Sequence, residues 1–258
     1  MSERIDGRWE HERYCAGLEA EMARFIEVVR HVDPATPVPS CPGWTIAVLV
    51  KHHGSTHRWV EHVVRTRANE RVRSRDVEIG LPDDEADYPV WLAAGVASLV
   101  AALRAVDPDA PMWTWGPDRH ARFWSRRVLH EAVVHRADAE LALGREPLIA
   151  PRTAVDGIDE FLTNLPFAPR VAERLRELGG EGATLHLHST DADGEWMITL
   201  QPDGFTWARG HGKGTVAVRA PASDLLLLTY GRRKPAADRF AVFGDQRLLE
   251  RWLETSAF

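Results

Sequence analysis

The sequence predicts an α+β protein of two domains, in which a four-helix bundle precedes an α+β domain with a small antiparallel sheet. Three observations support this prediction. Up to residue 144, apolar residues recur at helical spacing in four segments, and loops separate these segments. From residue 184 on, apolar residues occur at every second position, as in strands, and two Asp-Gly pairs mark hairpin turns. A proline-bounded stretch at 147–151 is typical of a linker, so we expect domains at 1–148 and 152–258.

The first domain is predicted to be helical because its segments have apolar stripes and recognisable ends. In the first helix the stripe includes Leu18, Met22 and Val29, and prolines follow it. Thr45 can cap the second helix, and Gly144 can end the fourth. The expected helices are 10–31, 45–67, 88–105 and 119–143, with a polar loop at 68–87.

The second domain is predicted to combine helices with short strands. Pro166 interrupts its first helical stretch, and Asp193-Gly194 and Asp203-Gly204 join segments that alternate between apolar and polar residues. The expected helices are 153–165, 168–178, 222–230 and 246–254. The expected strands are 184–188, 195–200, 205–207, 215–218 and 242–243.

The composition is that of a globular protein. Of the 258 residues, 44% are hydrophobic and 27% are charged, which excludes disordered and fibrous classes. A net charge of −6 argues against nucleic acid or an anionic membrane as a partner. No apolar run approaches the length of a membrane span, and the N-terminus has no apolar signal core. Because the two cysteines make no disulfide framework, we expect a cytoplasmic protein.

A carboxylate and an imidazole share one face of the fourth predicted helix. The segment 129–138 is similar to the HExxH zinc motif but has one residue more between its histidines. At about 100° per residue, His130 and His135 are about 140° apart, too far round the helix to share a metal ion. Glu131 and His135 are only about 40° apart and project together. This pair is therefore predicted to bind Zn²⁺ or Fe²⁺ with a further ligand from elsewhere in the bundle.

The second predicted helix offers that further ligand. His52 and His53 lie near the two sides of its apolar stripe, so either can point into the bundle, whereas His57 lies further round. Two helices then provide three ligands and an open position, as in catalytic zinc sites. The alternative is that Glu131 and His135 form an exposed pair and that the histidines of the second helix are polar contacts between helices.

Motifs in both domains resemble those of the mycothiol-dependent maleylpyruvate isomerase family. Their order and spacing carry the resemblance, which covers residues 15 to 253. In the first domain they are PSCPGWT at 39–45, Leu49-Val50, His52 and Glu131-x-x-x-His135-Arg136-x-Asp138. In the second domain they are AVDGIDEF at 154–161, Thr190-Asp191, Glu195-Trp196 and ASDL at 222–225, which leads to Gly231-Arg232.

The resemblance implies a DinB-like helical bundle that holds a divalent metal, usually zinc, and a sterol-carrier-like C-terminal domain. Carried over residue by residue, it implies His52, Glu131 and His135 as the metal ligands. It also implies mycothiol as the cofactor, whose sulfur the metal would hold as a thiolate. In the isomerase, that thiolate adds to a conjugated double bond, allows it to rotate and is expelled. Relatives that keep the thiol attached perform thiol transfer instead. The resemblance does not identify the residues that bind the thiol.

Several other features have both a functional and a structural interpretation. Arg232, at the predicted end of an apolar helix, is a candidate for holding a substrate carboxylate, or it interacts with the helix macrodipole. Arg122 and Arg126 present the same alternatives. A thiolate at Cys41 is favoured near a helix N-terminus, but without a base beside it we predict a small buried residue. The tryptophans of the first domain can wall a pocket, but we predict that they form core. His186 and His188 share one strand face, and without a third ligand we expect a pair on the solvent side.

We therefore expect a metal- and mycothiol-dependent enzyme that uses an activated thiolate on a small electrophilic substrate. The expected reaction is maleylpyruvate isomerase-like cis–trans isomerisation or thiol transfer. One alternative is a metal-dependent hydrolase on the same bundle, in which the open position holds water. The other is a non-enzymatic protein that binds an apolar ligand in its second domain. The expected partners are the thiol and the substrate, with neither nucleic acid nor a membrane, and the sequence leaves the oligomeric state open.

Overall fold

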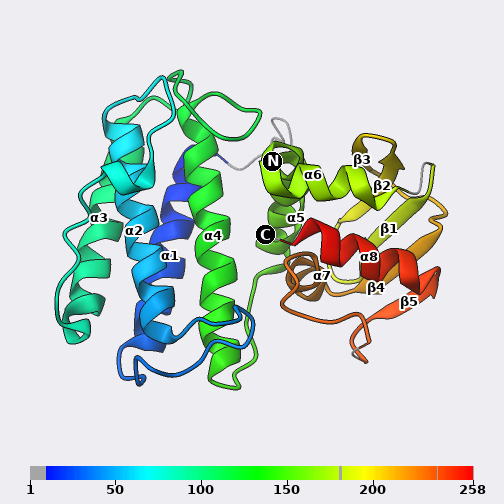
Figure 1. Ribbon diagram of the computed structural model, residues 1–258, viewed down its shortest axis with the longest axis horizontal. Helices are drawn as coiled ribbons and strands as arrows, with labels where there is room; N and C mark the ends of the chain where they lie inside the picture. The colour runs from blue at the N-terminus through cyan, green and yellow to red at the C-terminus, as the bar shows by residue number, and fades with distance from the viewer. Residues whose placement is uncertain (1–9, 180–181, 237, 258) are drawn as a thin grey trace, which may run out of the picture. The chain divides into compact units, whose positions relative to one another are not determined.

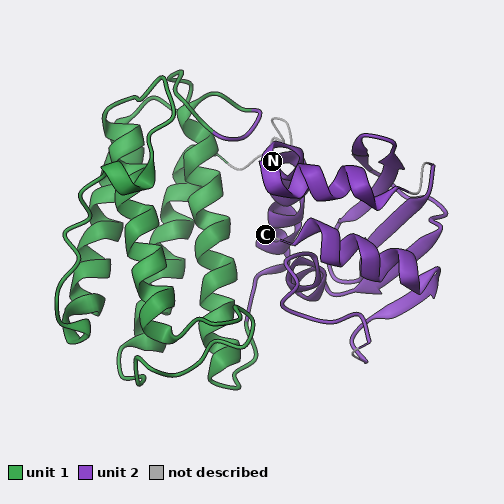
Figure 2. Ribbon diagram, in the orientation of Figure 1, with its two compact units in different colours: residues 1–114, 118–147 green, residues 115–117, 148–258 purple. Residues whose placement is uncertain are grey.

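Figure 1 shows the computed structural model, which describes residues 10–179, 182–236 and 238–257. The N-terminus, where no signal core is expected, lies outside the described residues. The chain divides into two compact units, drawn in different colours in Figure 2: unit 1 (1–114 and 118–147) and unit 2 (115–117 and 148–258). Long helices form unit 1, whereas unit 2 combines helices with a sheet. The predicted α+β class, with a helical part followed by a part that contains a sheet, is confirmed.

Four long helices pack against one another in unit 1. They are α1 (His11–Val29), α2 (Ile46–Arg65), α3 (Tyr88–Ala105) and α4 (Ala121–Ala142). α1 contacts α3 and α4, and α2 contacts the same two helices, which is the arrangement of a bundle. The loop predicted at 68–87 contains short 3₁₀ turns at Ser74–Asp76 and Glu85–Asp87. Each helix predicted in the first domain is therefore present, with ends that differ by a few residues.

A cap and an apolar stripe explain two of these helices. Thr45 Oγ1 accepts a hydrogen bond from the Val48 backbone N–H at 3.4 Å, so α2 begins where the sequence predicts. Leu18, Met22 and Phe25 of α1 are completely buried. Burial of side chains of this size contributes about 1.5–3 kcal/mol each to folding. The stripe therefore holds α1 against α3 and α4.

The α3 segment is more apolar than expected from its sequence. Glu85–Ala105 meets the length and composition of a membrane span, with a mean hydropathy of 1.5, so the expectation that no apolar run approaches that length is wrong. In the structure, Trp91, Leu92, Val96 and Leu99 bury one side of α3 within unit 1. The other side carries mainly alanines, which raise the mean hydropathy although they are small and exposed. α3 therefore packs one side into the core of the bundle and exposes the other.

Unit 2 is built around a sheet whose strands follow the order β3-β2-β1-β4-β5. The strands are β1 (Thr184–Ser189), β2 (Glu195–Gln201), β3 (Gly204–Arg209), β4 (Val216–Ala220) and β5 (Ala241–Gly244). The helices are α5 (Pro151–Asn164), α6 (Pro169–Leu178), α7 (Ala222–Thr229) and α8 (Gln246–Ser256), with a 3₁₀ turn at Leu165–Phe167. Each helix and strand predicted in the second domain is present.

The sheet is mixed rather than purely antiparallel. The pairs β1–β2, β2–β3 and β4–β5 are antiparallel, as predicted, but β1 and β4 run parallel. The Asp-Gly turns indicate the hairpins, whereas β4 follows residues 210–215, here called the crossing segment. This segment returns the chain from the end of β3 to the start of β4, on the other side of β1. The parallel direction of β4 therefore depends on this connection and not on a turn signal.

The two faces of the sheet have different surroundings. Leu185, Trp196 and Ile198 are buried on the face that the helices of unit 2 cover, where α6, α7 and α8 contact the strands (Figure 1). Side chains alternate along β1, so His186 and His188 point to the other face. The exposed fraction of His186 is only 5%. The expectation of a histidine pair on the solvent side is therefore wrong for His186.

Candidate metal centre

A tight loop before α2 brings two side chains to the candidate centre. Its backbone N–H groups at Cys41 and Trp44 donate to the carbonyl groups of Val38 and Cys41, each at 2.9 Å, and the Val38 N–H donates to the Trp44 carbonyl. Gly43 has a φ of +83°, in the left-handed region that favours glycine. These contacts hold Cys41 on the buried side of the loop and Trp44 beside the first turns of α2.

His52 on α2 meets Glu131 and His135 on α4. His52 Nε2 lies 2.9 Å and His135 Nε2 lies 3.2 Å from the same oxygen, Glu131 Oε1. The other oxygen, Oε2, accepts a hydrogen bond from Arg127, one turn earlier on α4. Glu131 and His135 project together, as their spacing predicts. The sequence leaves the choice between His52 and His53 undecided, and the structure brings His52 to the carboxylate.

Trp44 and the burial of the ligand side chains determine from which side solvent reaches the centre. The ring of Trp44 lies 5.0 Å from that of His52 and stacks at 5.9 Å on that of His135, measured between ring centroids. The exposed fraction of the side chain falls from 35% at His52 to 20% at Glu131 and 9% at His135. Solvent therefore reaches the centre from the His52 side, and the His135 end is closed.

His135 has a carboxylate partner at its second ring nitrogen. Its Nδ1 lies 2.8 Å from Asp138 Oδ2, an oxygen that also accepts the Cys41 thiol at 3.3 Å. A carboxylate at Nδ1 fixes the ring and directs Nε2 toward Glu131, which is the usual arrangement behind a metal-binding histidine. Cys41 is buried, as predicted, but an imidazole and a carboxylate lie beside it, which the sequence did not indicate.

The charges around the centre keep Glu131 ionised. Burial by itself raises the pKa of this carboxyl, but Arg127, His135 and His52 outweigh burial and hold the pKa well below its ordinary value. Burial lowers the pKa of His135, whereas Glu131 and Asp138 raise it, and the result lies well above the ordinary value. In the absence of a metal, the two groups form a charge pair. A metal ion must displace the proton of His135, so its affinity falls as the pH falls.

Three other histidines of the bundle are buried without meeting the carboxylate. The rings of His53 and His57 lie 5.3 Å apart, and their nitrogens have no hydrogen-bond partner among the described residues. Burial holds the pKa of His53 well below its ordinary value and lowers the pKa of His57 to about 3, so both rings are neutral. His130 is completely buried and is not among the residues grouped at Glu131.

The donor set at the centre fits a divalent transition metal. Two imidazole nitrogens and one carboxylate oxygen are ligands that zinc takes in catalytic sites. Tetrahedral ligands about 2.0–2.1 Å from the ion are about 3.3 Å apart. The observed separations from Oε1, 2.9 and 3.2 Å, are close to that value, and the three donor atoms lie within 4.8 Å of one another. The role of His52, Glu131 and His135 as ligands stays a prediction.

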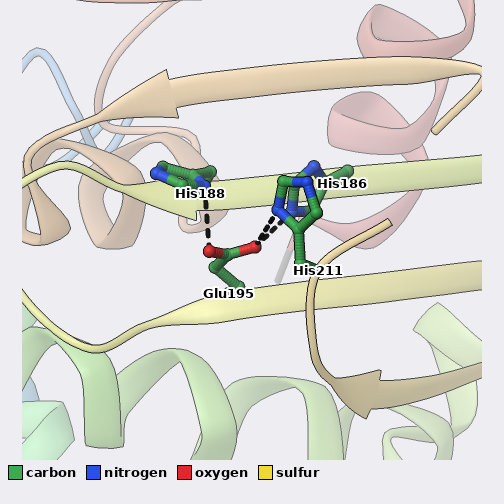
Figure 3. A group of neighbouring side chains, drawn as sticks. All are labelled: His186, His188, Glu195 and His211. Carbon is green, nitrogen blue, oxygen red and sulfur yellow. Dashed lines mark hydrogen bonds and ion pairs between the residues drawn. The ribbon is translucent and has the colours of Figure 1, made fainter. Parts of the chain in front are cut away.

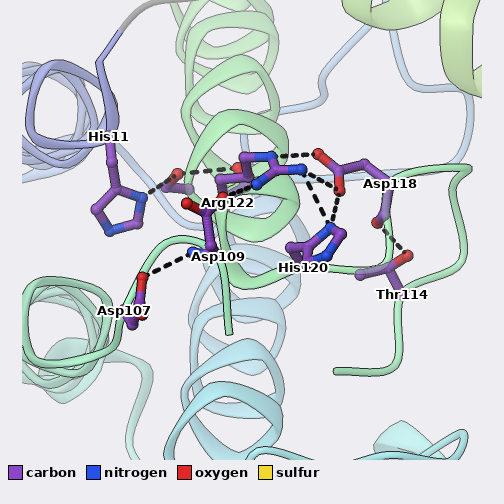
Figure 4. A network of polar contacts seen from close by, with 8 residues as sticks. His11, Asp107, Asp109, Thr114, Asp118, His120 and Arg122 are labelled. Carbon is purple, nitrogen blue, oxygen red and sulfur yellow. Dashed lines mark hydrogen bonds and ion pairs between the residues drawn. The ribbon is translucent and has the colours of Figure 1, made fainter. Parts of the chain in front are cut away.

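Arg122, considered for a substrate carboxylate, belongs to a network at the start of α4. Its Nε lies 2.8 Å from Asp118 Oδ2, and its Nη1 pairs with Asp109 (Figure 4). Asp118 Oδ1 also lies 2.7 Å from the ring of His120. These contacts tie the loop before α4 to the first turn of the helix, which favours the structural interpretation of Arg122.

The sequence pattern assigns no role to Arg127 and Asp138, and it assigns Trp44 to the core or to the wall of a pocket. Arg127 precedes Glu131 by four residues and Asp138 follows His135 by three, so helical spacing contains a signal for both. No comparable signal exists for Trp44, because a loop places it. Of the other tryptophans predicted to be core, Trp124 is buried, whereas Trp59 and Trp113 are half-buried and pack against its ring.

Comparisons with known proteins identify the family and the fold of this chain. The model of the mycothiol maleylpyruvate isomerase N-terminal domain matches residues 15–140, and that of the MDMPI C-terminal domain matches residues 152–251. Among solved structures, the crystal structure of the mycothiol-dependent maleylpyruvate isomerase is similar, with 16% identity and a TM-score of 0.60 over 91% of this chain and 93% of that chain. A variant of that protein, with a histidine replaced by alanine, has a TM-score of 0.59 and the same identity and coverage. At this identity the likeness shows the fold. A search of the curated proteins finds no match.

Proposed function

This chain belongs to the mycothiol-dependent maleylpyruvate isomerase family, and on that basis we propose that it is a metal- and mycothiol-dependent isomerase. Its proposed substrate is a small, electrophilic, anionic molecule with a conjugated double bond. The observation that carries the proposal is that His52 and His135 both contact the same oxygen of Glu131, at a place that solvent reaches from one side. Thiol transfer is the related reaction that ends with the thiol attached. A cytoplasmic location stays a prediction from the cysteine content.

The proposed ligands of the metal are His52, Glu131 and His135. Zinc is the metal we propose, because the donors are two imidazoles and one carboxylate. When bound there, the metal supplies a positive charge that keeps a thiol sulfur deprotonated near neutral pH.

The residues around the ligands support this use of the centre. Arg127 binds one oxygen of Glu131 and so directs the other toward the two histidines. Asp138 holds the His135 ring with Nε2 facing the same point. The ring of Trp44 covers His135 and excludes water from that side, while the partly exposed His52 leaves a path for the thiol and the substrate.

The proposed reaction is a cis–trans isomerisation by addition and elimination. A thiol bound at the centre would supply a nucleophile that adds to one carbon of the conjugated double bond and leaves again, so that the carbon–carbon bond could rotate in between. His52, Glu131 and His135 would hold the metal that keeps the sulfur deprotonated. No atom would be gained or lost, so the reaction would need no oxidant, reductant or water.

Arg232 is the residue that we propose for the substrate carboxylate. Its Nη1 donates to the Tyr230 carbonyl at 2.7 Å, at the C-terminal end of α7, and this contact restrains the side chain. A guanidinium is suited to hold a carboxylate by charge-assisted hydrogen bonds. The same position also lets the charge interact with the dipole of α7.

Metal content and thiol binding test the proposal together. Wild-type protein, a His52→Ala variant and a His62→Ala control on the same helix would be compared by metal analysis and by calorimetric titration with mycothiol. We expect His52→Ala to hold about one metal ion fewer per chain than wild type and to lose thiol binding and isomerisation of maleylpyruvate. His62→Ala should behave like wild type. Unchanged thiol binding and activity in His52→Ala would contradict the proposal.

The two alternative functions are not favoured, because both family models come from the isomerase. They nevertheless predict different results in the same experiment. A hydrolase on the same centre retains activity without any thiol. A binding protein holds an apolar ligand and neither metal nor thiol.

A further inference from the structure

A second group of side chains with metal-binding chemistry lies in unit 2. His186 and His188 point to the same face of β1, and the pairing with β2 places Glu195 directly opposite His188. His211 reaches the same face from the crossing segment (Figure 3). In the sequence, His186 and His188 have no apparent third ligand. The fold supplies two, from separate parts of the chain.

Glu195 is the centre of this group. Its Oε2 lies 2.7 Å from His211 Nδ1 and 3.1 Å from His186 Nε2, and its Oε1 lies 3.2 Å from His188 Nδ1. The four candidate ligand atoms lie within 4.8 Å of one another. Tetrahedral ligands of a zinc ion are about 3.3 Å apart. Small side-chain movements are therefore enough to place all four around one ion.

Glycines bring the crossing segment close to the sheet. A Cβ at Gly212 would lie 3.1 Å from Met197 Sδ, and a Cβ at Gly214 would lie 3.0 Å from the His186 backbone nitrogen and 2.4 Å from the Val216 carbonyl oxygen. At Gly214 a side chain would therefore collide with the backbone of the sheet. The absence of side chains at these positions lets the histidine of the segment turn toward Glu195.

The group is open to solvent on one side only. The exposed fraction of the side chain is 6% for His186, 23% for His188, 28% for Glu195 and 77% for His211. An ion can therefore enter beside His211, and the buried ring of His186 closes the inner side. Since His211 is exposed and lies between two glycines, its side chain can adjust to an ion at little cost.

We propose that His186, His188, Glu195 and His211 bind a divalent transition-metal cation, for which Zn²⁺ is the best match. Three imidazoles and one carboxylate complete a tetrahedral shell. Unlike the three-ligand group of the bundle, this site has no open position for a substrate, which is characteristic of structural zinc. The ion fastens the crossing segment to the sheet and stabilises unit 2 by its binding free energy.

Zinc content and thermal unfolding of the untagged chain test this proposal. Wild type would be compared with His211→Ala and Glu195→Gln, and with Lys213→Ala, an exposed position of the crossing segment that offers no ligand. We expect His211→Ala and Glu195→Gln each to retain about one zinc ion fewer per chain after dialysis than wild type. Both should also lose the rise in unfolding midpoint that zinc causes in unit 2, whereas Lys213→Ala keeps both properties.

Equal zinc content and equal midpoint shifts in wild type and His211→Ala overturn the proposal, because the four side chains then form a hydrogen-bonded network only. Retention of zinc only at millimolar free ion also overturns it, as adventitious binding. If Glu195→Gln does not fold, the exposed His211 still provides the decisive variant. The outcome is separate from that of the bundle, because His52→Ala leaves this second ion in place.

Discussion

Each polar group of the bundle centre divides its atoms between two kinds of partner. Glu131 presents one oxygen to His52 and His135 and uses the other to accept from Arg127. His135 directs Nε2 toward Glu131 and Nδ1 toward Asp138. In each group, one atom is bound by Arg127 or Asp138, and the other faces the proposed metal position. Arg127 and Asp138 are therefore positioning residues, which affect metal affinity without being ligands.

Replacement of Asp138 tests this role. In Asp138→Asn the side-chain amide can donate to His135 Nδ1, which favours the tautomer with the proton on Nε2 and opposes metal binding there. We expect zinc affinity to fall about 10–100-fold with the fold retained. Competition with a chelator of known affinity measures the change. Glu140→Gln, which alters a carboxylate on the same helix that pairs with Arg136, should leave the affinity unchanged. Equal affinity in both variants contradicts a positioning role for Asp138.

Arg232 should affect substrate binding and not metal content. Loss of a charge-assisted hydrogen bond costs about 1.5–3 kcal/mol, so Arg232→Gln should raise KM for a carboxylate substrate about tenfold or more. Steady-state kinetics and metal analysis of the same samples give both quantities. Lys234→Gln, two residues further along and exposed, is the matched control. An unchanged KM in Arg232→Gln excludes the residue from substrate binding.

Buried neutral His57 should make the bundle sensitive to acid. Burial lowers its pKa to about 3 from the ordinary 6.5, so below 6.5 the unfolded chain binds a proton that the folded chain does not. Stability is therefore lost as the pH falls from about 6.5 toward 3, by up to about 1.4 kcal/mol per pH unit. In His57→Leu this contribution disappears, so the unfolding free energy should depend less steeply on pH between about 6 and 5. Urea unfolding measures the slope, and His31→Leu, at an exposed position, should keep the wild-type slope.

Helices α2 and α3 approach closely because α2 has a glycine at their contact. A Cβ at Gly54 would lie 2.0 Å from the ring of Trp91, which is itself buried. On α3, a Cβ at Gly95 would lie 2.4 Å from the end of the flexible Arg58 side chain. The two glycines thus differ in what a larger residue would displace. A buried ring cannot move away without disturbing the core, whereas displacement of the arginine costs its hydrogen bonds to the Gly54 and Trp91 carbonyl groups.

These two positions give a matched pair of helix substitutions. Alanine has a higher helix propensity than glycine by about 1 kcal/mol, but overpacking costs about 1–3 kcal/mol or more. We expect Gly54→Ala to lower the free energy of unfolding, and Gly95→Ala to lower it less or to raise it. Denaturant unfolding of both variants decides the point. A stabilised Gly54→Ala would show that Trp91 can leave its position without cost.

The molecule as a whole carries its two candidate metal sites in separate units. All proposed ligands of the first come from α2 and α4, and all those of the second come from β1, β2 and the crossing segment. A bound ion orders the segments that carry its ligands, so excess zinc should slow amide hydrogen exchange in two distinct sets of segments. His52→Ala should lose the protection in α2 and α4 only, and His211→Ala that in unit 2 only. Loss of both sets in one variant contradicts this independence.

Much of this architecture is visible in short stretches of sequence. The apolar stripes, the Thr45 cap and the Asp-Gly turns indicate the helices and hairpins that the structure contains. The pairing of Glu131 with His135 follows from helical spacing alone, because residues four apart lie on one helix face. Such features depend on hydrogen bonds and side-chain spacing within a few residues. A short window of sequence therefore carries all the information that they need.

Only the tertiary structure decides which distant residues meet. It brings His52 rather than His53 to Glu131, runs β4 parallel to β1, and adds Glu195 and His211 to a histidine pair that appeared incomplete. It also places Trp44 over the rings of the bundle centre. These contacts join segments separated by many residues, and their formation depends on how a whole unit packs around its core. Local patterns indicate how each segment folds, whereas the packing energy of a whole unit determines which distant segments come into contact.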